Sequence, residues 1–551
     1  MKNRIVAFLS AVVLLGASAL QAQKTVPAGQ VASASAGSSS QAFVVLNPAH
    51  YHAYVEQFAR DEREATSKDA ADAWPWIAAH IPLFESSEKS FEEMYYFRWY
   101  AWQKHVVKSR HGFLIAEWLP KPEAADGNFG VLPDAAPMHL GEARWLRDST
   151  AAEDYARFWI APDARPRLYS FPLAESVRQV ELATGDRKLG VEMLAGLVAN
   201  YRGWEETNLD SSTGMYWQID TRDAMEKSIG GDGYRTPLNS YQAADARAIA
   251  AFARRAGETK TAAEFDAKAQ TLETLIETKL WNAKDGFYEV LSPSVESGIR
   301  KQKKFIDPGT QLQLSGVREL IGYIPWQYTR LTAEHAVAWK QLFDPQGFAG
   351  KYGPTTAERR SPRFRFASSD QCTWNGPSWP YATTQTLAAL GNLLNGPSQP
   401  YISRQEYYQL FANYVASQHI TLPSGRKIDW IDEDLDADTG EWIAKRMLIE
   451  KHKQVGRGNY YNHSGFADPL ITGLVGLRPR EDNKVELNPL LPAGKWEWFA
   501  LDGLPYHGHL LAVLYDRSGK KYGRGRGLML YVDGKKIAGR KDLGPLGATL
   551  P

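Results

Sequence analysis

The chain has 551 residues, and 64 basic residues almost balance 63 acidic ones, for a formal net charge of +1. This length is sufficient for a large core and for more than one domain. Because the charge is balanced and no basic tract occurs, a nucleic-acid-binding surface is not expected. The single cysteine, Cys372, excludes an internal disulfide framework.

Residues 1–22 have the features of a cleavable signal peptide. Two basic residues precede an apolar run over residues 5–20, and the small-residue sequence Leu20-Gln21-Ala22 follows. The run is short for a bilayer span and has no charged stop-transfer flank, so we expect cleavage without a membrane anchor. Residues 23–45 are mostly small and polar, which is typical of a flexible tether. These features predict a periplasmic or secreted protein.

Residues 46–480 are predicted to be mostly helical. In Thr259–Leu280 the apolar residues recur at intervals of three and four, the pattern of one buried helix face. Many such segments joined by loops favour stacked helical hairpins. The clearest predicted helices are 90–105, 174–183, 186–204, 241–255, 259–280, 332–342, 382–394 and 404–418.

A short turn motif occurs three times in this helical region, at residues 210–216, 281–288 and 436–442. Each copy combines Asp, Asn or Thr with a glycine and then an aromatic residue, which predicts a tight turn. The spacing is irregular, so a solenoid is not expected. We interpret the motif as one hairpin corner that is reused around a ring.

The sequence pattern changes near Arg480. Alternating apolar residues at 484–487, 510–515 and 528–532 predict strands, and Asp533-Gly534 is a hairpin-type turn. We therefore predict a small C-terminal β module over residues 481–551.

The aromatic content is high, with 18 Trp, 26 Tyr and 21 Phe. Core packing is the ordinary use of these residues, and stacking on sugar rings is the functional alternative. Hydrolysis of a glycoside needs one carboxylic acid and a second carboxylate. Carboxylates that lie among aromatic and turn residues are therefore the candidates for a catalytic role.

The first candidate cluster is residues 214–231, where Trp217 precedes Asp220, Asp223 and Glu226. Asp223 and Glu226 are three residues apart, so one helical turn would place them on one face. The structural alternative is a capped helix start, with Asp223 as the cap and Glu226 at the third helical position.

The second cluster is the rigid loop 374–381, which contains Trp374, Asn375 and Trp379. Its prolines and glycine exclude a helix interior. The loop is either a packed corner or a sugar subsite.

The third cluster, 430–442, contains Glu433 as a candidate catalytic carboxylate. Alternating Asp434, Asp436 and Asp438 faintly resemble a calcium loop, but the glycine and the expected glutamate are misplaced for one. The fourth cluster contains Tyr461 and His463 among polar residues, which suits binding of sugar hydroxyls.

Two smaller groups complete the candidates. Glu142, Arg144 and Trp145 form a possible substrate-binding group. His507 and His509 would share one strand face, but no third metal ligand is evident, so we favour hydrogen bonding. No cofactor or metal is expected.

In this order, the segments 223–231, 235–241, 372–381, 433–440 and 461–464 resemble the mannosylglycerate-hydrolase-like six-hairpin glycosidases. That group is similar to trehalases and processing α-glucosidases, and the resemblance covers roughly residues 90–480. It implies a mainly α fold, an (α/α)6 toroid of helical hairpins followed by the small β module.

The resemblance also implies an inverting, exo-acting hydrolase of α-linked sugars, with an oligosaccharide or glycoside as substrate. By motif order, Asp223 matches the family's general acid and Glu433 its general base, while Asp220 and Glu226 stay open as alternatives. Asn239 lies in a matching segment and joins the substrate-binding candidates. The alternative functions are a rhamnosidase-like hydrolase, a polysaccharide lyase that uses Tyr461 and His463, and a non-catalytic glycan-binding protein.

Overall fold

The structure is a computed structural model that describes residues 43–119, 130–293, 311–330, 333–365, 372–447 and 458–551. The predicted signal peptide and nearly all of the predicted tether lie outside these residues. Residues 42–551 form one compact unit. Across the described ranges, no helix has both the length and the apolar character needed to cross a bilayer.

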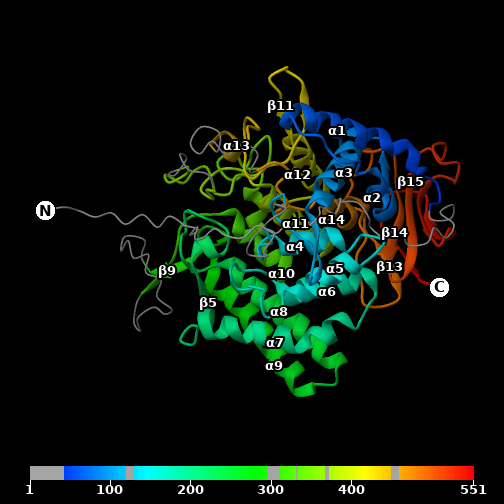
Figure 1. The fold of residues 1–551 in the computed structure, drawn as a ribbon. Coiled ribbons are helices and arrows are strands. Elements are labelled where there is room, and N and C mark those ends of the chain that lie inside the picture. Colours follow the sequence, from blue (N-terminus) through cyan, green and yellow to red (C-terminus); the bar gives the residue numbers. More distant parts are fainter. Residues whose placement is uncertain (1–42, 120–129, 294–310, 331–332, 366–371, 448–457) are drawn as a thin grey trace, which may run out of the picture. The chain divides into compact units, whose positions relative to one another are not determined.

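Helices dominate the chain up to about residue 475, as the sequence predicts (Figure 1). The expected helix at 332–342 is instead a 3-10 helix over Glu334–Gln341. The described α-helices are α1 (His52–Thr66), α2 (Trp74–His80), α3 (Lys89–Trp102), α4 (Ala136–Ala143), α5 (Thr150–Phe158), α6 (Leu173–Thr184), α7 (Leu189–Asn208), α8 (Thr236–Arg255), α9 (Thr259–Leu275), α10 (Ile324–Tyr328), α11 (Pro380–Asn395), α12 (Arg404–Ser417), α13 (Ile443–Met447) and α14 (Ala467–Pro469).

Neighbouring helices pack in sequence order and then close into a ring. Helix α8 packs against α7 and α9, and α11 packs against α10 and α12. Helix α12 also contacts α3, so the last hairpins of the helical region meet the first. The fold is an (α/α)6 toroid, which confirms the predicted fold class.

Burial distinguishes inner from outer helices of the ring. In α9 the buried residues Ala262, Phe265, Ala269 and Leu272 form one stripe, the pattern of a helix with one solvent face. Helix α8 is buried on nearly all sides and is rich in alanine, which allows close packing in the interior. The inner helices α4, α8, α11 and α14 are each preceded by a loop, and these loops carry the candidate site.

The predicted turn motifs form as expected. Strands β4 (Leu209–Asp210) and β5 (Met215–Gln218) pair across the first motif, and β7 (Trp281–Asn282) and β8 (Phe287–Tyr288) pair across the second. The side chain of Asp210 accepts the backbone N–H of Ser212, and that of Asp436 accepts the N–H of Asp438. Strand β5 also joins β6 (Gly233–Tyr234), β9 (Leu291–Pro293) and β10 (Leu312–Leu314) in one sheet. The other short pairs are β2 (Val106–Ser109) with β3 (Gly112–Ile115), and β11 (His419–Thr421) with β12 (Lys427–Asp429).

The C-terminal strands form an antiparallel sheet in the order β1-β14-β15-β16-β17. The predicted turn at Asp533-Gly534 joins β16 (Gly527–Val532) to β17 (Lys535–Arg540). Strands β14 (Trp498–Tyr506) and β15 (His509–Asp516) form its centre, while β13 (Lys484–Leu487) pairs with β18 (Leu546–Thr549).

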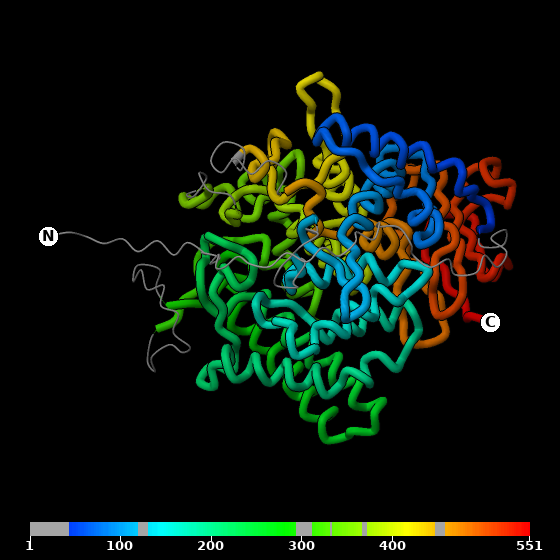
Figure 2. Tube along the Cα trace, in the orientation of Figure 1, coloured from blue at the N-terminus to red at the C-terminus, as the bar shows by residue number. Residues whose placement is uncertain are grey.

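One edge strand comes from the other end of the chain, which the sequence did not predict. Strand β1 (Leu83–Ser86) pairs with β14, so N-terminal and C-terminal segments lie side by side (Figure 2). The carboxylate of Asp502 in β14 also accepts the backbone N–H groups of Val44, Val45 and Leu46. The β module is therefore bound to the start of the helical region.

Candidate active site

Glu433 lies in the extended segment after β12 and is almost completely buried. This segment is held in place by Leu435, which forms a β-bridge with Ser378 in the loop before α11. The Cys372 thiol, at the start of the same loop, donates a hydrogen bond to Oε1 of Glu433. The two loops therefore fix the position of this carboxylate.

Glu226 lies in the loop before α8 and is attached to the same loop of residues 372–379. The backbone N–H of Trp374 donates to the carbonyl oxygen of Glu226 over 2.9 Å. Ala224 and Lys227 on either side have φ angles of 56° and 58°. Non-glycine residues seldom adopt this left-handed conformation, and such strain is concentrated at functional sites.

The charge environment of Glu226 includes Glu433. Burial, together with the negative charges of Asp134, Glu433 and Asp220, raises the pKa of Glu226 to about 8. The Glu226 side chain is only partly buried, whereas Glu433 is 2% exposed. A carboxyl group that keeps its proton near neutral pH, beside a second carboxylate, is the arrangement that general acid catalysis requires.

Two further carboxyl groups, Glu117 and Asp134, belong to this cluster and were missed by the sequence analysis. Burial and the charge of Asp134 raise the pKa of Glu117 well above its ordinary value, with smaller effects of Glu433 and Glu226. Burial raises the pKa of Asp134 to about 7. Oε2 of Glu117 and Oδ1 of Asp134 are buried without a hydrogen-bond partner among the described residues. These two oxygens thus have unused hydrogen-bonding capacity within the cluster.

A sequence signal for these two residues exists but is weak. Glu117 is followed by Trp118 at the end of the apolar strand β3, and Asp134 comes just before α4. Neither position repeats or matches a motif, and only the ring closure brings them to Glu433.

Asp223 has a different environment. Its Oδ2 accepts a hydrogen bond from Nε of Arg235 over 2.6 Å, and both side chains are 0% exposed. Burial raises the pKa of Asp223, while the charge of Arg235 opposes this effect. A general acid must reach the oxygen of the leaving group, so this fully enclosed ion pair does not favour Asp223 as the acid. Asp220 is buried as well, and its side chain accepts the N–H of Thr221.

The aromatic residues predicted to bind substrate lie in two different parts of the structure. Trp374 and Trp379 stack on each other with centroids 5.1 Å apart, and Trp379 contacts the ring of His463. They lie in the loop that holds Glu226 and Glu433, but they are 2% and 4% exposed. Trp217 is partly buried and packs edge-on against Tyr234 in the sheet of β5 and β6.

The predicted asparagines also differ. Both amide atoms of Asn375 are buried without a partner in the described parts of the chain, as expected of a ligand-facing group. The amide of Asn239 is used structurally, because it bonds the backbone of Tyr216 and Arg235.

Tyr461 and His463 lie at the cluster, with ring centroids 4.4 Å apart. The hydroxyl of Tyr461 donates to Glu117, and burial with the Glu117 charge raises its pKa well above the ordinary value. Burial also lowers the pKa of His463 well below its ordinary value. A lyase would need an easily ionised tyrosine, and these shifts do not supply one.

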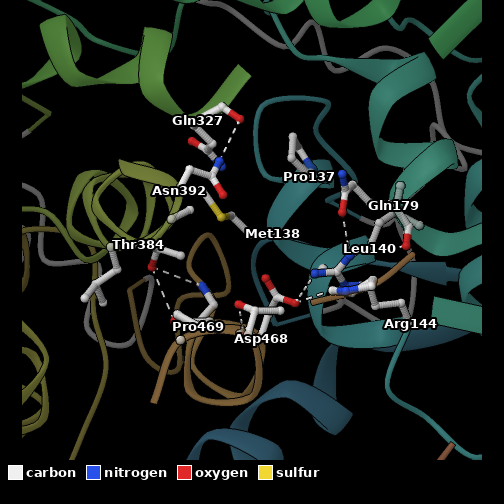
Figure 3. Close-up of a pocket in the computed structure, with 18 of the residues that line it drawn as sticks. Pro137, Met138, Leu140, Arg144, Gln179, Gln327, Thr384, Asn392, Asp468 and Pro469 are labelled. Atoms are coloured by element: carbon white, nitrogen blue, oxygen red, sulfur yellow. Dashed lines mark hydrogen bonds and ion pairs between the residues drawn. The ribbon is translucent and has the colours of Figure 1, made fainter. Parts of the chain in front are cut away.

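Glu142, Arg144 and Trp145 lie at the far end of α4 from Asp134, about 12 Å along the helix. Glu142 accepts the N–H groups of Phe466, Ala467 and Asp468, which caps the start of α14. Arg144 donates to Oδ1 of Asp468 (Figure 3), and Trp145 donates to the same oxygen. The structure therefore separates this group from the carboxyl cluster.

The remaining candidate metal positions have other partners. Asp438 pairs with Arg359, and Asp434 accepts the N–H of Ala444. His507 donates to the carbonyl of Leu182, and His509 contacts Asp533. Within the described ranges, His, Cys, Asp and Glu side chains form no group of three suited to a metal ion.

Comparison with known proteins identifies the family of this chain. Residues 129–464 match the family model of the mannosylglycerate hydrolase MGH1-like glycoside hydrolase domain, and residues 477–538 match the C-terminal domain of glycosyl hydrolase family 65. The first match covers more than half of the chain and contains Asp134, Glu226 and Glu433.

Among solved structures, one named sialidase is 34% identical over 93% of this chain, with a TM-score of 0.83. The chain spans 46% of that protein's length. A GH63 mannosylglycerate hydrolase from Thermus thermophilus is 15% identical, with a TM-score of 0.48, over 68% of this chain and 98% of its own. Neutral trehalase from Saccharomyces cerevisiae is 12% identical, with a TM-score of 0.40, over 64% of this chain and 72% of its own.

Several carboxyl groups thus lie together in loops of the toroid. The family model matches the same region of the chain. The chain belongs to the mannosylglycerate hydrolase MGH1-like glycoside hydrolase family.

Proposed function

We propose that Glu226 is the general acid and Glu433 the general base of an inverting glycosidase. The observation that carries this assignment is the pKa of Glu226, which is raised to about 8 by burial and by charges that include Glu433. Glu226 would protonate the leaving oxygen, and Glu433 would activate the attacking water. Asp223, the acid expected from motif order, becomes a support of the loop through Arg235.

The substrate follows from the same cluster. Glu433, as the base, would be an ionised carboxylate that is almost completely buried, and an acidic sugar bound beside it would be repelled. We propose a neutral α-linked glycoside that is cleaved from one end of the chain. An acidic sugar, as a sialidase would take, is the alternative that the 34% identical neighbour raises.

The test compares Glu226→Gln and Glu433→Gln on aryl glycosides with good and poor leaving groups. Good leaving groups need little protonation. The activity of Glu226→Gln should therefore fall about 10²–10⁴-fold on substrates with poor leaving groups and much less on substrates with good leaving groups. Glu433→Gln should lose activity on all substrates alike, because each turnover needs the activated water. Glu264→Gln, on the exposed face of α9, is the matched control. Equal losses for Glu226→Gln on both substrate types would remove Glu226 from the acid role.

The anomeric configuration of the product tests the inverting mechanism separately. Proton NMR of the first-formed sugar should show the β-anomer from an α-glycoside, since an inverting reaction changes the anomeric configuration. Formation of the α-anomer first would indicate a retaining reaction and would contradict the base role of Glu433.

We also propose export, based on the basic and apolar segments of residues 1–22. Mass spectrometry of protein from the periplasm or medium should find a chain that starts at Gln23. Recovery of only the full-length chain inside cells would contradict export.

A further inference from the structure

A cavity of about 290 Å³ runs along α4 from Pro137 to Arg144 (Figure 3). Residues from α4, α6, α11 and the start of α14 line it. Asp134 and Arg144 lie beyond opposite ends of α4, about 15 Å apart at the rise of an α-helix. The cavity thus extends from the first turn of α4, near Asp134, to Arg144 beyond its other end, and its volume is near the lower limit of about 300 Å³ for small-molecule pockets.

Arg144 and Arg178 in this cavity are neutralised by neighbours. Arg144 donates through Nε and Nη2 to Oδ1 of Asp468, and through Nη1 to Gln179. Arg178 pairs with Glu175 over 3.3 Å. These two cations thus have carboxylate partners and need no ligand for charge balance.

Arg478 differs from both. Its side chain makes one hydrogen bond to the described residues, from Nη2 to Oδ1 of Asn392 over 3.1 Å, and it forms no ion pair with them. Burial and the nearby Arg144 charge lower its pKa, and the charges of Tyr407 and Glu486 oppose this effect. Of the cationic side chains described along this lining, Arg478 is the one without a carboxylate partner.

The overall charge of the lining agrees with this difference. Arg144 pairs with Asp468, and Arg178 pairs with Glu175 and with Glu481 outside the lining, so the lining cation without an ion-pair partner among the described residues is Arg478. A partly buried guanidinium without a counter-ion is unfavourable, and an oxyanion bound to its planar fork would relieve the cost.

Uncharged polar groups border the same space. Oε1 of Gln327 is buried without a partner in the described ranges, while the amides of Asn392 and Gln179 lie at the lining and hold Arg478 and Arg144 in place. Apolar surface comes from Met138 and Leu140 (Figure 3). Such a mixture suits a small molecule with hydroxyl groups attached to its anionic end.

We propose that this cavity is a second ligand site, which binds a small organic oxyanion, a carboxylate or a phosphate ester, through Arg478. The size and lining fit a ligand no larger than a sugar acid or a sugar phosphate. The proposed anion-binding residue, Arg478, lies near Arg144, beyond the end of α4 that is opposite Asp134, so the anion would bind away from the carboxyl cluster.

The test is isothermal titration calorimetry at constant ionic strength with three probes. D-glucuronate presents a carboxylate, glucose 6-phosphate presents a phosphate, and glucose is the neutral control. At least one anion should bind the wild-type protein with one site per chain, and glucose should bind there much more weakly. The relative affinities of the two anions decide which oxyanion the cavity prefers.

Three variants locate the site. Arg478→Gln keeps an amide donor for Asn392 but removes the charge, and it should weaken anion binding about 10- to 100-fold. Arg254→Gln removes an equal charge from an exposed pair with Asp266 and should leave binding unchanged. Ala388→Leu fills the cavity from α11 without altering any charge and should also weaken binding.

The result can be separated from the hydrolase assignment. In Glu433→Gln protein, the anion should bind as in the wild type even though hydrolysis is lost. If neither anion binds the wild type, or if Arg478→Gln binds it equally well, the second site is ruled out. If Glu433→Gln abolishes anion binding, the anion occupies the carboxyl cluster and the proposal is also wrong.

Discussion

The thiol of Cys372 donates to Oε1 of Glu433 with 2.7 Å between the two heavy atoms. Burial and the charges of Glu433 and Glu226 raise the pKa of this thiol well above its ordinary value. The group therefore keeps its proton and acts as a hydrogen-bond donor, not as a nucleophile. Its role is to orient the carboxylate that we assign as the base.

Substitutions at Cys372 should separate this donor from simple packing. Cys372→Ser keeps an O–H donor and should retain most of the activity, whereas Cys372→Ala should lower kcat about 5- to 20-fold. Steady-state kinetics with a poor leaving group would measure the difference, and circular dichroism would check the fold. If Ser and Ala variants lose activity equally, the hydrogen bond to Glu433 has no catalytic role.

The pH dependence should report the raised pKa of Glu226. Since the acid works only when protonated, kcat/KM for poor leaving groups should fall as pH rises through about 8. In Glu226→Gln protein this alkaline limb should disappear, while the acidic limb remains. An unchanged alkaline limb in the variant would mean that another group supplies the proton.

The same shift affects stability, and its sign is opposite to that of most carboxylates. The folded pKa of about 8 lies above the ordinary value of 4.5, so protonation of Glu226 favours the folded state. This contribution is complete below about pH 4.5 and is lost as pH rises through 8. Calorimetric Tm values should therefore decline less between about pH 5 and 8 in Glu226→Gln than in the wild type. A steeper decline in the variant would contradict the raised pKa.

Asp223 and Arg235 should behave as a structural pair. Asp223→Asn leaves a buried guanidinium without its counter-charge, and we expect a loss of about 3–5 kcal/mol in unfolding free energy. Denaturant unfolding would measure this loss, with Glu226→Gln as the control that leaves the pair intact. A variant of normal stability that has lost activity only on poor leaving groups would instead restore Asp223 as the acid.

Asp502 should connect the β module to the start of the helical region. Asp502→Ala removes the acceptor for Val44, Val45 and Leu46, and we expect a loss of about 1–3 kcal/mol together with faster proteolysis near residue 43. The control is Asp542→Ala, which removes an exposed partner of Arg540 just after β17 of the same sheet. Equal effects of the two substitutions would show that the N-terminal contact is not special.

Local patterns were sufficient for most elements of the fold. The three-and-four spacing in 259–280 reflects a one-sided burial stripe, so it predicts α9 without knowledge of its neighbours. Asp533-Gly534 likewise identifies its hairpin, because the turn needs two residues at positive φ, and both have it, at 48° and 76°. Strand β1 was missed, since its partner β14 lies more than 400 residues away.

The sequence alone was sufficient to predict the family, the helical toroid and Glu433 as a candidate catalytic residue. These predictions depend on turn residues, aromatic clusters and helix periodicity, which are properties of local segments. The distinction between Glu226 and Asp223, three residues earlier in the same loop, depended on the folded structure. Their local contexts are similar, but Asp223 meets Arg235 in the interior while Glu226 faces charges from Asp134 and Glu433. Protonation depends on the charges and burial around a group in space, and these are set when the ring closes.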